Sequence, residues 1–82
     1  MIDVDTDRFA KSVLIAVAEE CDYSTGKHVP EGAITRHFKS HLRGEVKNKL
    51  KKLVKTPYIV KHPTGRNDTF NITQDGLTKA QE

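Results

Sequence analysis

Apolar residues recur along this chain with two different spacings, which predict helices first and a β-hairpin afterwards. In the middle of the chain, Leu42, Val46, Leu50 and Leu53 lie three or four positions apart and form one stripe of a helix. Two runs rich in β-branched and aromatic residues follow, and they predict strands on either side of a turn-rich segment. In chain order, the pattern predicts a helix over residues 6–21, a short strand near Val29, a helix over 30–38, a helix over 41–55, strands over 58–62 and 69–73, and a short helix over 74–80.

Residues that favour helix ends support these boundaries. Asp5 or Thr6 can cap the first helix, Ser40 the third and Thr73 the last, because short polar side chains accept hydrogen bonds from free backbone N–H groups. Pro57 ends the third helix, since a proline disfavours helical geometry in the residue before it. The sequence therefore predicts a small α+β fold with a three-helix core, a β-hairpin and a short C-terminal helix.

With 82 residues, the chain is expected to form a single domain over residues 1–82. A domain of this size buries only roughly 60% of the surface of its unfolded chain, which leaves little room for a deep substrate cleft. We therefore expect a module that works through its surface rather than an enzyme, and we expect no cofactor.

Cysteine content and hydropathy favour a cytoplasmic protein. Cys21 is the only cysteine, so it cannot form an intramolecular disulfide, and we expect it in the core. The N-terminal residues are acidic and lack the basic and then apolar pattern of a signal peptide. The longest apolar run, residues 13–18, is far shorter than the ~20 residues needed to cross a bilayer, so we expect no membrane association.

The net charge of +3 is distributed unevenly. Residues 36–66 carry ten basic side chains and one acidic side chain, whereas residues 1–35 carry three basic and seven acidic ones. Residues 67–82 are again acidic, with one basic and three acidic side chains. A cationic middle segment favours a polyanionic partner, and a solvated lysine-rich helix is the alternative interpretation.

The order of elements and several residues of the second half resemble the winged helix-turn-helix superfamily. Two helices joined by a short turn are typical of a helix-turn-helix, and a hairpin directly after them adds a wing. The resemblance covers roughly residues 6–80, but the specific residues lie in the second half. They are Val46, Leu50, Leu53, Pro57, Tyr58 and Ile59 at the family's spacing, followed by Ile72-Thr73-Gln74-Asp75-Gly76.

Pro57 departs from the family pattern, which usually has glycine at this position. That glycine normally ends the recognition helix in a left-handed conformation that proline cannot adopt. We therefore expect the helix to end in another way, and the family pattern does not fix the angle between helix and wing.

The resemblance implies that the helix over residues 41–55 is a recognition helix, which would enter the major groove of DNA. On it, Asn48 is the best candidate for reading a base, because an amide can bind adenine bidentately, and Gly44 would let the backbone approach the duplex. Arg66, at the expected wing tip, could enter the minor groove. Arg43 and Lys47 are second choices for reading a base, toward guanine, and Lys61 extends the basic strip along the wing. With the candidate phosphate contacts added, the expected DNA-binding residues are Ser40, His41, Arg43, Gly44, Lys47, Asn48, Lys51, Lys52, Lys55, Lys61 and Arg66.

Lysine contacts are compact point charges, so we expect phosphate-dominated binding of double-stranded DNA with modest sequence selectivity. Such binding would suit a transcriptional regulator or a chromosome-associated protein. The alternative is a protein-interaction module within a larger assembly, with a second copy of the chain or another protein as partner. RNA or single-stranded DNA is a third option, which exposed aromatic residues would favour.

The four histidines do not form an evident metal site. His37 and His41 have the i, i+4 spacing that one helix can offer to zinc, but the predicted turn interrupts the helix between them. His28 and His62 have no obvious companion in the sequence. We therefore expect no bound metal.

Overall fold

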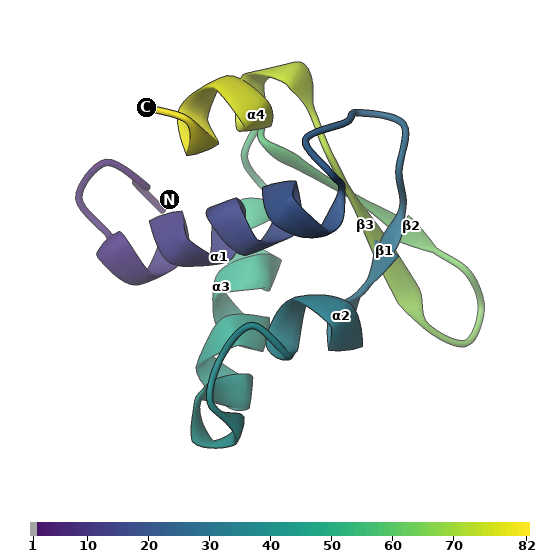
Figure 1. Ribbon diagram of the computed structural model, residues 1–82. Coiled ribbons are helices and arrows are strands. Elements are labelled where there is room, and N and C mark those ends of the chain that lie inside the picture. The colour runs from purple at the N-terminus through teal and green to yellow at the C-terminus, as the bar shows by residue number, and fades with distance from the viewer. Residues whose placement is uncertain (1) are drawn as a thin grey trace.

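Residues 2–82, the part of the chain that the computed structural model describes, form four α-helices and a three-stranded antiparallel sheet (Figure 1). The α+β class expected from the sequence is confirmed. The elements are α1 (Arg8–Glu20), β1 (Val29–Pro30), α2 (Glu31–Thr35), the 3-10 turn η1 (Ser40–Leu42), α3 (Arg43–Leu53), β2 (Ile59–Pro63), β3 (Asp68–Ile72) and α4 (Gln74–Ala80). Within this range, every helix is too short or too polar to span a bilayer.

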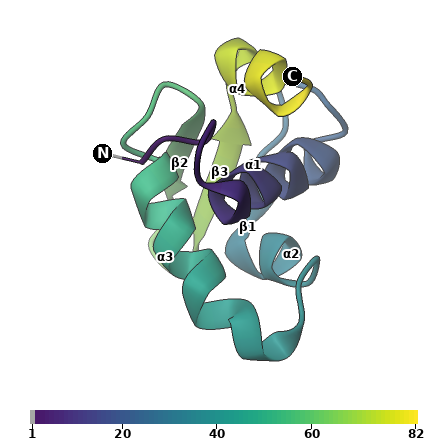
Figure 2. The same cartoon turned by 90° about the vertical axis from the view of Figure 1, so that its left-hand side faces the viewer.

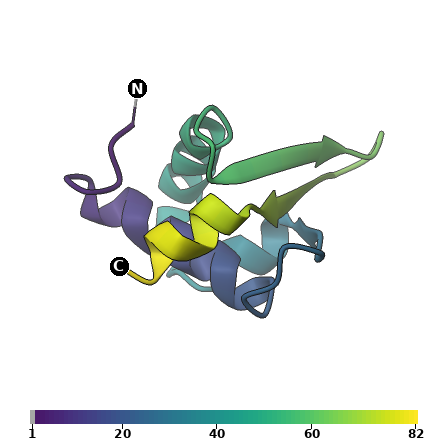
Figure 3. The same ribbon diagram turned by 90° about the horizontal axis from the view of Figure 1, so that it is seen from above.

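The sheet joins the two halves of the chain. β3 lies in the middle, with β1 on one side and β2 on the other. In the antiparallel register, Phe70 of β3 pairs with Val29 of β1 and with Lys61 of β2. Seen from above, the β2–β3 hairpin extends away from the helices (Figure 3). β1 therefore ties this hairpin to the segment between α1 and α2.

The core lies between α1, α3 and one face of the sheet. α1 packs against α2, α3 and α4 (Figure 2). Its buried side includes Val13, Leu14 and Val17. Cys21 is buried at the end of α1, as expected. Fully burying one large aliphatic side chain stabilises the fold by roughly 1.5–3 kcal/mol, so this cluster is the main source of stability. α3 and the sheet contribute Val46, Leu50, Leu53, Ile59, Phe70 and Ile72.

The first helix begins later than the sequence predicted, because Asp7, and not Asp5 or Thr6, is its N-cap. The Asp7 carboxylate accepts a hydrogen bond from the Ala10 N–H at 3.0 Å, and Asp7 has extended backbone angles. Before it, the carbonyl of Asp3 accepts hydrogen bonds from the N–H groups of Thr6 and Asp7. Because of this turn, the helix begins only after Asp7, at Arg8.

The second helix is also shorter than predicted and spans five residues. After it, the chain turns so that the ring of Phe38 packs against Phe9 of α1, with 5.5 Å between the ring centroids. Ser40 is not an N-cap, because it is the first residue of the 3-10 turn, which has no side-chain cap. The third helix consequently begins at Arg43 rather than at His41.

The hydroxyl of Thr56 terminates α3 ahead of Pro57. It donates a hydrogen bond to the Leu53 carbonyl at 2.6 Å and accepts one from the Tyr58 N–H at 3.2 Å. No residue from 53 to 59, all of them described, has a positive φ. The expectation that this helix ends without a left-handed residue is confirmed, although it ends at Leu53, two residues earlier than predicted.

Thr73 joins the β2–β3 hairpin to α4. Its hydroxyl accepts a hydrogen bond from the Gly76 N–H at 3.0 Å, which confirms the predicted N-cap, and donates one to the Pro57 carbonyl at 2.6 Å. Gly76 lies so close to the chain before β2 that a Cβ atom there would be 2.4 Å from the Tyr58 carbonyl oxygen. The predicted bounds of α4 are confirmed. Each strand of the hairpin is shifted by one residue from its prediction, and capping by Thr73 accounts for the earlier end of β3.

Candidate nucleic-acid interface

One face of α3 is exposed along its whole length. The opposite face packs in the core through Val46, Leu50 and Leu53, which confirms this part of the predicted stripe. Leu42 lies in the preceding 3-10 turn and is partly buried. Ser40 and His41 in the preceding turn are exposed as well. All the candidates on α3 or just after it are exposed: Arg43, Gly44, Lys47, Asn48, Lys51, Lys52 and Lys55.

A hollow of about 310 Å³ lies between α3 and the β2–β3 hairpin. Three of its lysines come from α3 or its C-terminal end, and Lys61 comes from β2. The fold thus brings candidates from the helix and from the hairpin to one place. We call this site the α3–hairpin hollow, and its lining residues are Glu31, Lys47, Leu50, Lys51, Val54, Lys55, Lys61, Asp68 and Phe70.

Two of the four lysines in the α3–hairpin hollow are held in ion pairs. The ammonium of Lys47 lies 3.6 Å from the carboxylate of Glu31, the first residue of α2. The ammonium of Lys61 lies 3.7 Å from the carboxylate of Asp68, the first residue of β3. Both pairs are partly exposed, so solvent screens them and each is weak. The sequence analysis included Lys47 and Lys61 among the DNA-binding residues, but the sequence does not reveal their ion pairs with these carboxylates.

The other cationic candidates have no such competitor. Within residues 2–82, none of their nitrogen atoms forms an ion pair with a carboxylate. No carboxylate of the described chain therefore lies at ion-pair distance from these cations, which leaves them available to an anionic partner. These candidates are Arg43, Lys51, Lys52, Lys55 and Arg66.

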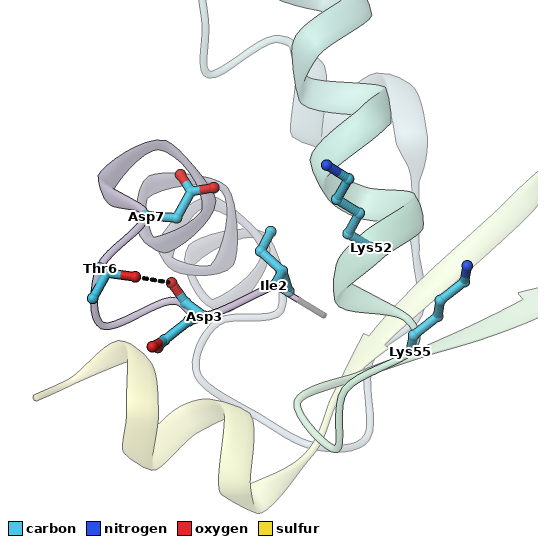
Figure 4. A pocket seen from close by; sticks show the side chains of 6 residues that line it. All are labelled: Ile2, Asp3, Thr6, Asp7, Lys52 and Lys55. Atoms are coloured by element: carbon cyan, nitrogen blue, oxygen red, sulfur yellow. Dashed lines mark hydrogen bonds between the residues drawn. The ribbon is translucent and has the colours of Figure 1, made fainter.

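Lys52 lies on the flank of α3 that is turned away from the hairpin. There it shares a cavity of about 460 Å³ with Lys55 and with the N-terminal segment, including Ile2 and Asp3 (Figure 4). Lys55 lines both this cavity and the α3–hairpin hollow. The structure therefore separates Lys52 from the hairpin candidates, and two acidic side chains, Asp3 and Asp7, line the cavity with it.

Lys49 has a structural role instead of a surface role. Its ammonium lies 2.6 Å from the Asp7 carboxylate, and only 19% of its side chain is exposed. The hydrogen bond from Lys49 is the main reason why the pKa of Asp7 lies below its ordinary value, and the Ala10 N–H adds to it. Lys49 consequently does not contribute to the exposed cationic face.

Arg66 lies at the tip of the hairpin, next to Gly65, whose φ is +89°. It is exposed and borders a hollow of about 490 Å³ between the hairpin tip and the start of α2, which Glu31 also lines. Arg66 is thus close to α2 as well as to the hairpin strands. The hollow contains no residue of α3, and the carboxylates of Glu31 and Asp68 line it together with Arg66.

Arg36, which sequence reasoning left out of the candidate site, belongs to the same surface. It is exposed, forms no ion pair within the described range, and borders a hollow that Arg43 and Lys47 also line. The sequence did indicate that Arg36 could belong to the surface, because it is the first basic residue of the cationic segment, residues 36–66. It was missed because it lies outside the third helix.

The histidines lie apart from this surface or at its edge, and two of them are companions after all. The rings of His28 and His62 stack with 4.2 Å between their centroids, which corrects the expectation that neither had a partner. The Nε2 atom of His62 is buried and has no hydrogen-bond partner among the described residues. His37 lies near the carboxylates of Glu19 and Glu20. Residues 2–82 contain no group of three or more potential metal ligands.

No protein-family model, curated protein or solved structure matches this chain.

Proposed function

We propose that the chain is a winged helix-turn-helix domain that binds double-stranded DNA. In this proposal α2 and α3 form the helix-turn-helix, α3 is the recognition helix, and the β2–β3 hairpin is the wing. The observation that carries the proposal is the exposed face of α3 and of its C-terminal end, which presents cations without an ion-pair partner. Two of them, Lys51 and Lys55, also line the α3–hairpin hollow. A transcriptional regulator or a chromosome-associated protein would use such a domain.

Phosphates supply most of the affinity in this proposal. We assign the phosphate contacts to the exposed cations that have no ion-pair partner, which are Arg43, Lys51, Lys52, Lys55 and Arg66. Because lysine reads little sequence, binding is tolerant of sequence, and selectivity rests on few side chains. Asn48 is the side chain assigned to bases, since its exposed amide can pair with adenine.

Gly44 gives independent support to a close approach of DNA. A Cβ atom at this position would meet nothing within 4 Å, so the fold itself does not require glycine there. A residue without a side chain on an exposed helical face is unfavourable for the helix, by up to about 1 kcal/mol relative to alanine. Close contact between the α3 backbone and a duplex would account for it.

The salt dependence of DNA affinity tests the proposal. If about five phosphates are neutralised, the logarithm of the association constant falls with the logarithm of salt concentration with a slope of roughly −4 to −5. Fluorescence anisotropy with a labelled mixed-sequence duplex measures this slope. Absence of binding at low salt would contradict the proposal.

A protein-interaction module is the second candidate function, and two exposed apolar side chains favour it. Tyr23 is 47% exposed in a loop with left-handed backbone angles, and Val60 is 40% exposed on β2. Both lie outside the α3 face. If they bind a second copy of the chain, the substitution Tyr23→Ser should lower self-association in sedimentation equilibrium and leave DNA affinity unchanged.

A further inference from the structure

Two carboxylates interrupt the cationic surface around the α3–hairpin hollow. Glu31 starts α2 and lines the hollow, and its Oε1 atom lies 3.6 Å from the Nζ atom of Lys47. Asp68 starts β3 and lines the same hollow, with its Oδ2 atom 3.7 Å from the Nζ atom of Lys61. Both carboxylates thus line the hollow with the four lysines, and each forms an ion pair with one of them.

A phosphate that approaches these lysines meets a competitor inside the protein. The negative charge of Glu31 beside the Lys47 ammonium weakens its attraction for a phosphate, and Asp68 acts in the same way on Lys61. The carboxylates also repel the phosphate directly, because like charges at close range raise the energy of the complex. Lys51 and Lys55, in the same hollow, have no carboxylate partner within the described chain.

We propose that Glu31 and Asp68 limit the affinity of this surface for DNA by competing with backbone phosphates for Lys47 and Lys61. This inference rests on the proposed function and adds a means by which the protein sets its own affinity. The two carboxylates withhold two lysines from sequence-independent contacts and so reduce binding to DNA of any sequence.

The test compares amide substitutions that remove a charge and keep the shape of the side chain. The variants are Glu31→Gln and Asp68→Asn, with Glu45→Gln as the matched control. Glu45 is exposed on α3 and belongs to no ion pair in the described range, so its loss removes the same charge without freeing a lysine. Affinity for one mixed-sequence duplex is measured at several salt concentrations.

Glu31→Gln should tighten DNA binding by about two- to fivefold, which corresponds to the strength of an exposed ion pair that DNA no longer has to displace. The salt slope should become steeper by about 0.9, because one more lysine releases a counter-ion. Asp68→Asn should behave in the same way through Lys61. Glu45→Gln should change affinity less and leave the slope unaltered.

A double-mutant cycle identifies the lysine responsible. In a Lys47→Gln background, Glu31→Gln should no longer steepen the salt slope. Equal effects of Glu31→Gln and Glu45→Gln, or a steeper slope that persists without Lys47, would overturn the inference while the proposed function stands. If the wild-type protein and all variants fail to bind DNA at low salt, the proposed function is wrong and this inference fails with it.

Discussion

Asp7 and Lys49 form an ion pair, with 2.6 Å between Oδ2 and Nζ, that links the first turn of α1 to the middle of α3. The same carboxylate caps α1 through its other oxygen, which accepts a hydrogen bond from the Ala10 N–H. One side chain therefore fixes both where the first helix begins and how the proposed recognition helix lies against it.

This pair should make stability depend on pH in the acid range. The pKa of Asp7 lies below its ordinary value of 3.8 in the fold, so the stabilisation is fully present above that value. It is lost as pH falls through the lowered pKa, because the unfolded chain then binds the proton more readily. Asp7→Asn keeps a capping side chain but not the charge. We expect urea unfolding to show wild type more stable than Asp7→Asn at pH 7, with the difference shrinking toward pH 3. A constant difference across this range would contradict the assignment.

Substitution of Gly76 should damage the fold. A Cβ atom at Gly76 would overlap the backbone carbonyl of Tyr58 and lie 2.7 Å from a side-chain carbon of Ile72, which is fully buried and has little freedom to move. We expect Gly76→Ala to cost about 1–3 kcal/mol of unfolding free energy, as is typical of overpacking. Gly44→Ala is the control, because a methyl group there meets nothing within 4 Å. Gly44→Ala should leave the free energy of unfolding unchanged or slightly raised, and it should weaken DNA binding. Equal losses of stability in the two variants would contradict the explanation by packing.

Thr56 should matter for the end of α3. Thr56→Val keeps the size of the side chain but removes the hydroxyl that bonds to Leu53 and Tyr58. Loss of two hydrogen bonds should cost about 1–2 kcal/mol in urea unfolding. The control is Thr78→Val on α4, an exposed position whose hydroxyl forms no hydrogen bond within residues 2–82. If both variants are equally stable, the hydroxyl does not terminate the helix.

Two lysines of α3 should affect different properties: Lys51 should affect DNA affinity, and Lys49 should affect the stability of the fold. Lys51 is exposed and unpaired, so Lys51→Gln should weaken DNA binding by about fivefold at ~0.15 M salt and make the salt slope shallower by about 0.9. Lys49→Gln should lower the free energy of unfolding instead, because it breaks the pair with Asp7. Anisotropy titrations and urea unfolding of both variants check this. Similar losses of affinity in the two variants would contradict the division of roles.

The periodicity of apolar residues was sufficient to predict the elements, since burial of one helical stripe or one strand face dominates their formation. Their ends were harder to predict. Asp5, Thr6 and Asp7 are consecutive and can all cap a helix, and the turn around the Asp3 carbonyl selects the last of them. Ser40 failed as a cap because the chain first forms a 3-10 turn.

The composition of the candidate surface was predictable, but its ion pairs were not. Glu31 and Lys47 are far apart in the sequence, and no local spacing rule connects them. The same holds for the stacked rings of His28 and His62. Lys49 did leave a signal, because it lies three residues after Val46 and four before Leu53, at the edge of the buried stripe. Helical geometry at that edge directs a side chain toward a neighbouring helix.

An NMR amide titration with a mixed-sequence duplex tests the central claim most directly. At low salt, we predict shifts concentrated in residues 40–55 and 61–67, which include the exposed face of α3 and the hairpin tip, and weaker shifts as salt is added. Residues of α4, outside that surface, should remain unchanged. A spectrum that stays unchanged at low salt, or shifts that centre on Tyr23 and α4, would contradict DNA binding by this face.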